Sequence, residues 1–286
     1  MMEAVSLSDD WRRMDREQLS RAYDNTGAVA DSAERLAGWR ERSAGLRAVH
    51  PSELDLAYGP GERNRFDLFR CGAADAPLFV FIHGGYWMRN SRQDFACMAE
   101  GPLAHGIDVA LVGYTLAPQA SLTGIAAEIR AGLRCLRERD EGRGPRRLVV
   151  SGWSAGGHLA ALAMAWPDVD AGLAISGVFD LAPIRETHLD DRLHLTEGEV
   201  AALSPIRCVP RGDKPLAIVC GARELPELRR QSAEYDRAWA ACGNTGSYAE
   251  LPGHDHFSIL DELIRPDGAL TALAVDLAHG AATGRG

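Results

Sequence analysis

The sequence GWSAG at residues 152–156 places Ser154 between small residues, directly after the apolar run RLVVSGW and before the helical stretch AGGHLAALAMAW. A serine in this strand–turn–helix setting is typical of a nucleophile elbow, in which small neighbours allow a strained turn to raise the hydroxyl above the sheet. The positive end of the following helix dipole would favour negative charge near the serine. An ordinary glycine-rich turn is the alternative, and the flanking strand and helix make it the weaker one.

A second motif, FIHGGYWM at residues 81–88, follows another apolar run. Loops of the HGG type supply backbone N–H groups that face the N–H of the residue after the nucleophile. We therefore expect the N–H groups of Gly84, Gly85 and Ala155 to form an oxyanion hole, in preference to a turn that serves packing only. His83 is expected to hold this loop and not to act as a base.

A serine nucleophile requires a base and an acid that orients the base, and in this architecture both follow the serine, the acid first. The segment LPGHDHFSIL offers His254 and His256, and we choose His256 as the base. The acid is expected after the run PLAIVCGA, where Glu224 lies closest to the strand end. Asp180, after the preceding strand, is the rival, and its alternative role is to cap or anchor the segment that follows.

Hydrophobic periodicity predicts the elements that must position these groups. Short apolar runs alternate with helical patterns, which predicts an α/β fold with a mostly parallel central sheet covered by helices on both faces. Residues 8 to about 45 are expected to form polar helices. The expected strands are 54–58, 65–69, 78–83, 108–114, 147–153, 171–179, 215–222 and 247–251, and the later helices are 93–103, 125–139, 155–166 and 227–241.

The chain is predicted to form a single domain over residues 1–286, because it has no internal repeat and no linker rich in proline, glycine or serine. Residues 1–50 would form an N-terminal helical arm. Residues 180–212 interrupt the alternation of strands and helices, and they are expected to form a small, cap-like insertion over the site.

The composition excludes several classes of protein. With 46% hydrophobic residues the chain can bury a substantial core, and its net charge of -9 argues against nucleic acid or an anionic membrane surface as a partner. Neither a signal-peptide core nor a transmembrane segment is found, which favours a cytoplasmic protein. Six scattered cysteines indicate reduced thiols and no zinc site. A homodimer is left open.

Together these motifs resemble the kynurenine formamidase (arylformamidase) branch of the α/β-hydrolase fold, close to the hormone-sensitive-lipase-like esterases. The resemblance runs from about Arg16 to Leu277 and rests on HGGYW, YTLAPQ, GWSAGGHLA, SGVFDLAPI, ELPELRRQS and DHFSI. HGG and G-x-S-x-G occur in many esterases, whereas their combination with SGVFDL, RRQS and DHF is more specific. The resemblance implies a catalytic triad of Ser154, Glu224 and His256. The family usually has aspartate where this chain has Glu224.

The implied chemistry is acyl transfer through an acyl-serine, which would release a formyl or acetyl group from a small aromatic amide or ester without a metal or organic cofactor. The aromatic part would stack in an apolar pocket formed by Tyr86, Trp87, Trp153 and Phe179. Core packing is the alternative role for at least one of these rings. A general short-chain carboxylesterase is the second candidate function. A non-catalytic binding protein on a hydrolase fold is the weaker third, since the serine and the histidine are both present.

Overall fold

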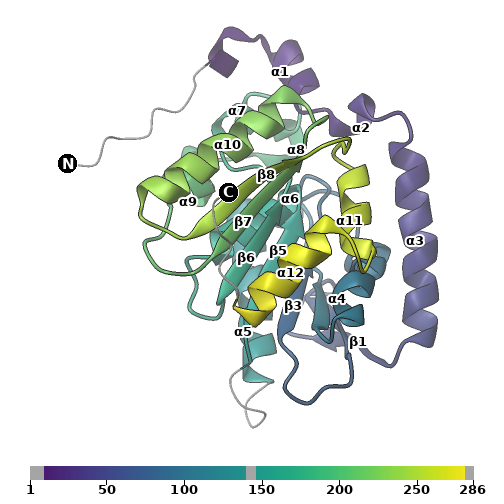
Figure 1. Ribbon diagram of the computed structural model, residues 1–286. Coiled ribbons are helices and arrows are strands. Elements are labelled where there is room, and N and C mark those ends of the chain that lie inside the picture. Colours follow the sequence, from purple (N-terminus) through teal and green to yellow (C-terminus); the bar gives the residue numbers. More distant parts are fainter. Residues whose placement is uncertain (1–9, 140–145, 281–286) are drawn as a thin grey trace.

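Eight strands form one continuous sheet at the centre of the computed structural model, which describes residues 10–139 and 146–280 (Figure 1). The strand order is β1-β2-β4-β3-β5-β6-β7-β8. β2 is antiparallel to β1 and to β4, and the remaining neighbours are parallel. The strands are β1 (Ser52–Ala57), β2 (Arg65–Phe69), β3 (Leu78–Ile82), β4 (Asp108–Val112), β5 (Leu148–Trp153), β6 (Ala171–Ile175), β7 (Leu216–Gly221) and β8 (Gly246–Leu251).

The inner strands are apolar throughout because the sheet is buried on both faces. Successive side chains of a strand point to opposite faces. In β3, Leu78, Val80 and Ile82 belong to one apolar layer, and Phe79 and Phe81 belong to the other. A continuous hydrophobic run in the sequence therefore becomes two separate cores, one on each side of the sheet.

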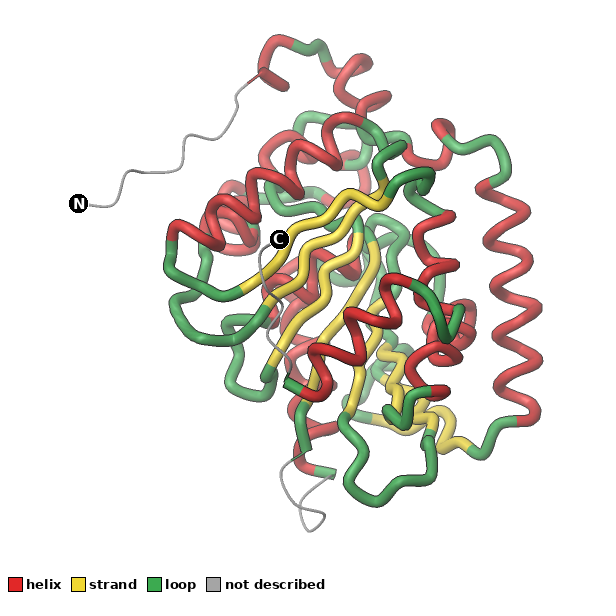
Figure 2. The backbone as a smooth tube through the Cα atoms, viewed as in Figure 1, coloured by secondary structure: helices red, strands yellow, loops and turns green. Residues whose placement is uncertain are grey.

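Helices cover both of these layers, as the tube view in Figure 2 shows. Side chains of α5, α6 and α10 pack in the layer that contains Val80, and those of α3, η2, α11 and α12 pack in the layer that contains Phe81. Among the described residues, no helix combines the length and the apolar character needed to cross a membrane. The helices are η1 (Asp10–Arg13), α1 (Arg16–Ala22), α2 (Asn25–Ala28), α3 (Ser32–Val49), η2 (Arg92–Ala99), α4 (Glu100–Ala104), α5 (Leu122–Glu138), α6 (Ala155–Ala163), α7 (Ala182–Arg185), α8 (Asp190–Leu193), α9 (Glu197–Leu203), η3 (Pro205–Arg207), α10 (Pro226–Ala241), η4 (Ser258–Leu260), α11 (Asp261–Ile264) and α12 (Ala269–His279).

The predicted α/β architecture is confirmed, and three elements differ from expectation. The N-terminal helical stretch is divided, because Asp15 and Asp24 cap new helices by accepting backbone N–H groups three residues further on; residues 8 and 9 lie outside the described residues. The expected helix 93–103 is largely a 3-10 helix with a kink at Phe95 (φ -120°, ψ 15°). The strand expected over 171–179 ends at Ile175, where Ser176 has a φ of 51° and turns the chain.

Helices α1, α2 and α3 form the N-terminal arm, and α3 stands along one side of the molecule in Figure 1. A buried ion cluster fixes α3 to the sheet. The Asp67 side chain in β2 is fully buried and accepts hydrogen bonds from Arg47 at the end of α3, from Arg92 in η2 and from the backbone N–H of Asp55. A buried carboxylate is tolerated only when its charge is paired and its oxygens are bonded. Asp67 therefore ties the arm, β2 and η2 together.

Replacing Asp67 tests this anchor. Asp67→Ala removes the buried carboxylate that Arg47 and Arg92 share and, among the described residues, leaves both guanidinium groups with Asp55 alone. Since Arg92 is itself only 5% exposed, the free energy of unfolding should fall by up to about 3–5 kcal/mol. Denaturant titration measures the change. Glu138→Ala breaks the exposed Arg134–Glu138 pair and is the matched control, with an expected loss below about 1 kcal/mol. Equal losses for the two variants would contradict the proposed anchor.

Candidate active site

Ser154 occupies the turn between β5 and α6, with φ 58° and ψ -118°. Such a conformation is unfavourable for a residue with a side chain, costing of the order of 1–3 kcal/mol, and it is typical of functional sites. The turn exists because its neighbours are glycines. A Cβ atom on Gly156 would collide with the carbonyl oxygen of Ile82, and one on Gly152 would collide with the backbone of Gly156. The short G-x-S-x-G pattern thus brings two backbone segments into contact beneath the serine.

His256 and Glu224 form a buried pair beside this turn. The Nδ1 atom of His256 lies 2.9 Å from Oε2 of Glu224, and the histidine and glutamate side chains are 4% and 0% exposed. The other carboxylate oxygen accepts hydrogen bonds from the Ser176 hydroxyl (2.5 Å) and from the Gly221 N–H (2.6 Å). Since Nδ1 is held by the carboxylate, Nε2 is the ring nitrogen left for a reacting group. Ser154 and His256 line the same cavity.

The two rival residues lie elsewhere. Asp180 pairs with Arg207 at 3.1 Å and accepts the N–H of Ala182, so it anchors the start of the 180–212 segment. His254 contacts the carbonyl oxygen of Ser258 through Nδ1, and its Nε2 lies 3.6 Å from Glu262. Glu224 and His256 are therefore the acid and the histidine that the structure brings together.

Aromatic side chains surround the histidine. Trp153 Nε1 donates a hydrogen bond to the His256 carbonyl oxygen (2.7 Å), and the centroids of the two rings are 5.0 Å apart. Trp39 of the N-terminal arm packs edge-on against Trp153 (5.8 Å) and stacks on Phe257 (6.2 Å). The arm therefore supports the loop that carries the histidine, although the two are far apart in the sequence.

The loop after β3 has an unusual backbone. Gly85, Tyr86 and Trp87 have φ values of 113°, 49° and 58°, a run of left-handed conformations that a side chain rarely adopts. This loop lies against the serine turn. A Cβ atom on Gly84 would be 2.7 Å from the Trp153 carbonyl oxygen and 3.0 Å from Cβ of Ser154. Glycine is thus required at this position for the loop to approach the serine.

The N–H groups expected to form an oxyanion hole belong to this contact region. Within the described part of the chain, the N–H groups of Gly84, Gly85 and Ala155 donate no hydrogen bond to protein. The Ala155 N–H belongs to the first turn of α6, where helical N–H groups have no intrahelical acceptor. These donors are free to bind an anionic oxygen, and the oxyanion hole stays a prediction.

His83 holds the loop from below. Its Nδ1 lies 2.9 Å from the Gly84 carbonyl oxygen, and its ring stacks on Tyr114 with centroids 4.4 Å apart. The Tyr114 hydroxyl donates to the His83 carbonyl oxygen. Burial lowers the pKa of His83 to about 4, so its ring is neutral at physiological pH. Its position beneath the loop fits the expected structural role.

The cavity at Ser154 has a volume of about 350 Å³. The expected insertion 180–212 contributes none of its lining residues, which corrects the prediction that this segment lies over the site. The segment instead docks on α5, where Glu199 accepts hydrogen bonds from Thr123. Four residues of the N-terminal arm contribute to the lining of the cavity. The lining residues are Asn25, Thr26, Leu36, Arg40, Gly85, Tyr86, Arg89, Asn90, Trp153, Ser154, His256 and Phe257.

Two of the four aromatic residues expected in the pocket are core residues. Trp87 is fully buried, and its ring packs edge-on against His158 at 4.9 Å. Phe179 is also fully buried and stacks on Tyr235 at 4.5 Å. Both rings are inserted into the apolar layer beneath α6 and α10, so their prediction as substrate-binding residues is wrong. Tyr86 and Trp153 do line the cavity.

Sequence reasoning missed the cavity residues of the arm, as well as Arg89 and Asn90 in the loop after β3 and Phe257 in the histidine loop. Phe257 could have been found from its position next to His256. Asn25 and Arg40 lie in polar helices that carry no catalytic motif, so nothing in their local sequence indicates the site.

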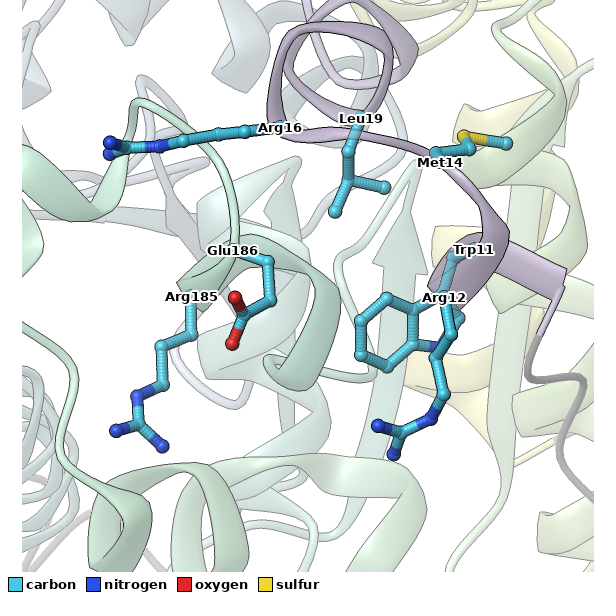
Figure 3. Close-up of a pocket in the computed structure, with 7 residues that line it drawn as sticks. All are labelled: Trp11, Arg12, Met14, Arg16, Leu19, Arg185 and Glu186. Atoms are coloured by element: carbon cyan, nitrogen blue, oxygen red, sulfur yellow. The ribbon is translucent and has the colours of Figure 1, made fainter.

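A larger hollow of about 550 Å³ lies away from these residues, between η1, α1 and α7 (Figure 3). Figure 3 shows Arg185 and Glu186 across from Trp11 and Arg12. None of the expected catalytic residues lines it, so its size does not make it the reaction site. Within the described residues, no group of histidine, cysteine, aspartate and glutamate is arranged to hold a metal ion.

The pKa values of the buried histidines predict acid instability. His158, one helical turn after Ser154, contacts the Leu203 carbonyl oxygen through Nε2, and burial lowers its pKa to about 4, as it does for His83. An unfolded histidine titrates near pH 6.5, so from about pH 6.5 to 4 the unfolded chain binds protons that the folded chain does not. Stability should therefore fall as the pH falls through this window, by about 1.4 kcal/mol per pH unit for each histidine.

Denaturant titrations of the wild type and of His158→Gln at several pH values measure this effect. The glutamine retains a donor for Leu203 but does not titrate, so the pH slope should decrease by about 1.4 kcal/mol per unit between pH 6 and 4.5. Identical slopes for the two proteins would show that His158 accepts a proton without unfolding.

Comparisons with known proteins agree with this geometry. The BD-FAE family model matches residues 68–174, which include both glycine motifs. Kynurenine formamidase of Salmo salar is 28% identical over 93% of this chain and 98% of its own length. The kynurenine formamidase of Danio rerio is 27% identical over 94% of this chain and 98% of its own length. Esterase LipQ of Mycobacterium tuberculosis is 27% identical and covers 74% of this chain and 58% of its own length.

Solved structures show the same fold. A Silicibacter protein provisionally described as a thioesterase superposes with a TM-score of 0.82 at 27% identity, over 89% of this chain and 98% of that chain. A Pyrobaculum calidifontis esterase superposes with a TM-score of 0.72 at 18% identity, and the match covers 97% of this chain and 100% of that chain. The chain is a hydrolase of the α/β-hydrolase fold, similar over nearly its whole length to kynurenine formamidases and related to the hormone-sensitive-lipase-like esterases.

Proposed function

We propose that this hydrolase uses Ser154 to remove a small acyl group, formyl or acetyl, from an aromatic amide or ester. The observation that carries the proposal is the buried Glu224–His256 pair, which shares one cavity with Ser154 on its strained turn. The similarity to kynurenine formamidases over nearly the whole chain supports a formyl group on an aromatic amine.

In the proposed mechanism, Nε2 of His256 accepts the proton of Ser154 as the serine oxygen attacks the substrate carbonyl. Glu224 holds the Nδ1–H and stabilises the imidazolium. The N–H groups of Gly84, Gly85 and Ala155 stabilise the oxyanion, where loss of one donor typically costs about 10²–10³ in rate. The imidazolium then gives its proton to the leaving amine or alcohol. Water, deprotonated by His256, attacks the acyl-serine. The imidazolium then returns this proton to the serine oxygen as the acyl bond breaks, which releases the small acid and restores the free serine.

Glutamate suits the acid position in this chain even though the resembling family usually has aspartate. The backbone turns immediately after β7, where the Glu224 N–H donates to the Gly221 carbonyl oxygen. The longer side chain folds back so that one oxygen meets the Gly221 N–H and the Ser176 hydroxyl while the other reaches His256. The extra methylene is thus taken up by this turn, and the carboxylate keeps the role that the mechanism requires.

The walls of the cavity support a small aromatic substrate. Tyr86, Trp153 and Phe257 provide aromatic surface beside Ser154, and a volume of about 350 Å³ is at the lower end of the range for small-molecule sites. Arg40 and Arg89 also line it, which would accommodate an acidic substituent on the aromatic group.

A short-chain carboxylesterase is the second candidate, because the same triad hydrolyses esters and because esterases are among the relatives. A non-catalytic binding protein is the weakest candidate, since such proteins commonly lose a member of the triad. Chain-length profiles with 4-nitrophenyl esters and rates with aryl formamides separate the first two. Formyl and acetyl substrates should be hydrolysed fastest, and a preference for octanoyl or longer esters would contradict the small-acyl site.

Ser154→Ala tests the nucleophile. The change removes one hydroxyl and no core volume, so hydrolysis of aryl formamides and esters should fall to background while the melting temperature stays unchanged. A fluorophosphonate probe should label the wild type and Ser247→Ala, a half-buried serine of β8, but should not label Ser154→Ala. Undiminished labelling of Ser154→Ala would assign the nucleophile to another residue.

Glu224→Gln tests the acid. An amide of the same shape cannot hold the imidazole in the required tautomer or stabilise its charged form, so kcat should fall by up to about 10⁴-fold. KM should change little, because ground-state binding does not use the acid. Asp180→Asn is the matched control and should affect stability only, through its pairing with Arg207. The opposite ranking of the two variants would place the acid one strand earlier.

A further inference from the structure

Asn25, the first residue of α2, carries a buried acceptor that the proposed mechanism does not use. The residue is 3% exposed and lines the cavity together with Ser154. Its Nδ2 donates a hydrogen bond to the Tyr86 hydroxyl (3.0 Å). Its Oδ1 is buried and has no hydrogen-bond partner among the described residues. Buried polar atoms are bonded in most proteins, so an exception requires an explanation.

The orientation of this carboxamide is fixed by its neighbours. The Tyr86 hydroxyl has one proton, which it donates to the Tyr23 carbonyl oxygen at 2.6 Å. Burial raises the pKa of Tyr86, so this proton is retained. The Tyr86 oxygen can therefore only accept from Asn25, which must present Nδ2 to it. Oδ1 consequently occupies the other end of the amide plane and remains an acceptor.

Hydrogen bonds to α10 hold the part of the N-terminal arm next to Asn25 in place. The Tyr23 hydroxyl donates to Glu227 (3.1 Å) and accepts from Gln231 (2.8 Å), both on α10. The main chain next to Asn25 is therefore held to the body of the protein by buried hydrogen bonds. Asn25 cannot turn its acceptor elsewhere without breaking its bond to Tyr86.

The polar groups at the cavity are thus of two types, hydrogen-bond donors and a hydrogen-bond acceptor. Gly85 and Ala155 offer N–H donors suited to the carbonyl oxygen of a substrate, whereas Asn25 offers an acceptor suited to an N–H group. Amides and esters share the carbonyl, but only a secondary amide carries an N–H on its leaving atom. A site built to bond a substrate N–H disfavours the analogue that lacks it, because the protein atom is then left unpaired.

We propose that Asn25 is a specificity-determining residue, whose Oδ1 accepts a hydrogen bond from the leaving-group N–H of an arylamide and so selects amides over esters. The inference rests on the proposed hydrolase function. The N-terminal arm would then contribute to the choice of the bond that is cleaved as well as to the wall of the cavity.

The test compares formanilide with phenyl formate, which differ only in the leaving atom. Loss of the acceptor in Asn25→Ala should lower kcat/KM for the anilide about 10-fold relative to the ester. Asn25→Asp keeps an acceptor oxygen but loses the Nδ2 donor to Tyr86, so it controls for the loss of that bond, and it should preserve the anilide-to-ester ratio within about 3-fold. Asn25→Leu, of similar volume, replaces the alanine variant if that variant does not fold. Asn244→Ala removes another buried asparagine, which bonds Pro210 and Gly212 away from the cavity, and should leave the ratio unchanged.

Two results would overturn the assignment while Ser154 is still labelled by the fluorophosphonate probe. One is an unchanged ratio in Asn25→Ala, which would leave the residue only its structural bond to Tyr86. The other is loss of the ratio in Asn25→Asp together with its retention in Asn25→Ala. If the wild type hydrolyses neither compound and Ser154 is not labelled, the proposed function fails along with this inference.

Discussion

The buried carboxylate of Glu224 joins three neighbouring parts of the sheet. Its oxygens bond a hydroxyl after β6, an N–H at the end of β7 and the histidine in the loop after β8. A charge without contact to water must have all these donors, so the carboxylate constrains how the strand ends are spaced. The position of His256, and hence any reaction at Ser154, depends on this constraint.

The N-terminal arm is linked to the site by three kinds of interaction. An ion cluster around Asp67 holds the end of α3, Trp39 packs against the aromatic rings behind His256, and Tyr86 bonds the backbone of Tyr23. These contacts act at separate points along the arm. The loop after β3, with its left-handed residues, is therefore held between the body of the protein and the arm, which keeps its N–H groups in place.

The sequence predicted the features that depend on local pattern. Ser154 and the glycines around it follow from the strand, the turn and the helix, whereas the choice between Glu224 and Asp180 required the geometry, because both follow parallel strands. Trp87 was placed in the wrong environment, since its left-handed turn sends neighbouring rings to different sides. The arm over the cavity could not be predicted, because its contacts join distant segments. The single domain, the cytoplasmic location and a homodimer remain predictions.

The cavity is lined both by Asn25 and by His256, which has a consequence for biosynthesis. These residues lie early and late in the sequence, so a ribosome releases the arm long before the loop against which it packs. Contacts between residues so far apart in the sequence form slowly and late in folding. Closing a long loop costs entropy before any contact can compensate for it. A nascent chain that ends before the loop after β8 lacks His256 and Phe257, and so lacks part of the lining of the cavity. Hydrolytic activity should therefore appear only after the loop that carries His256 has been synthesised.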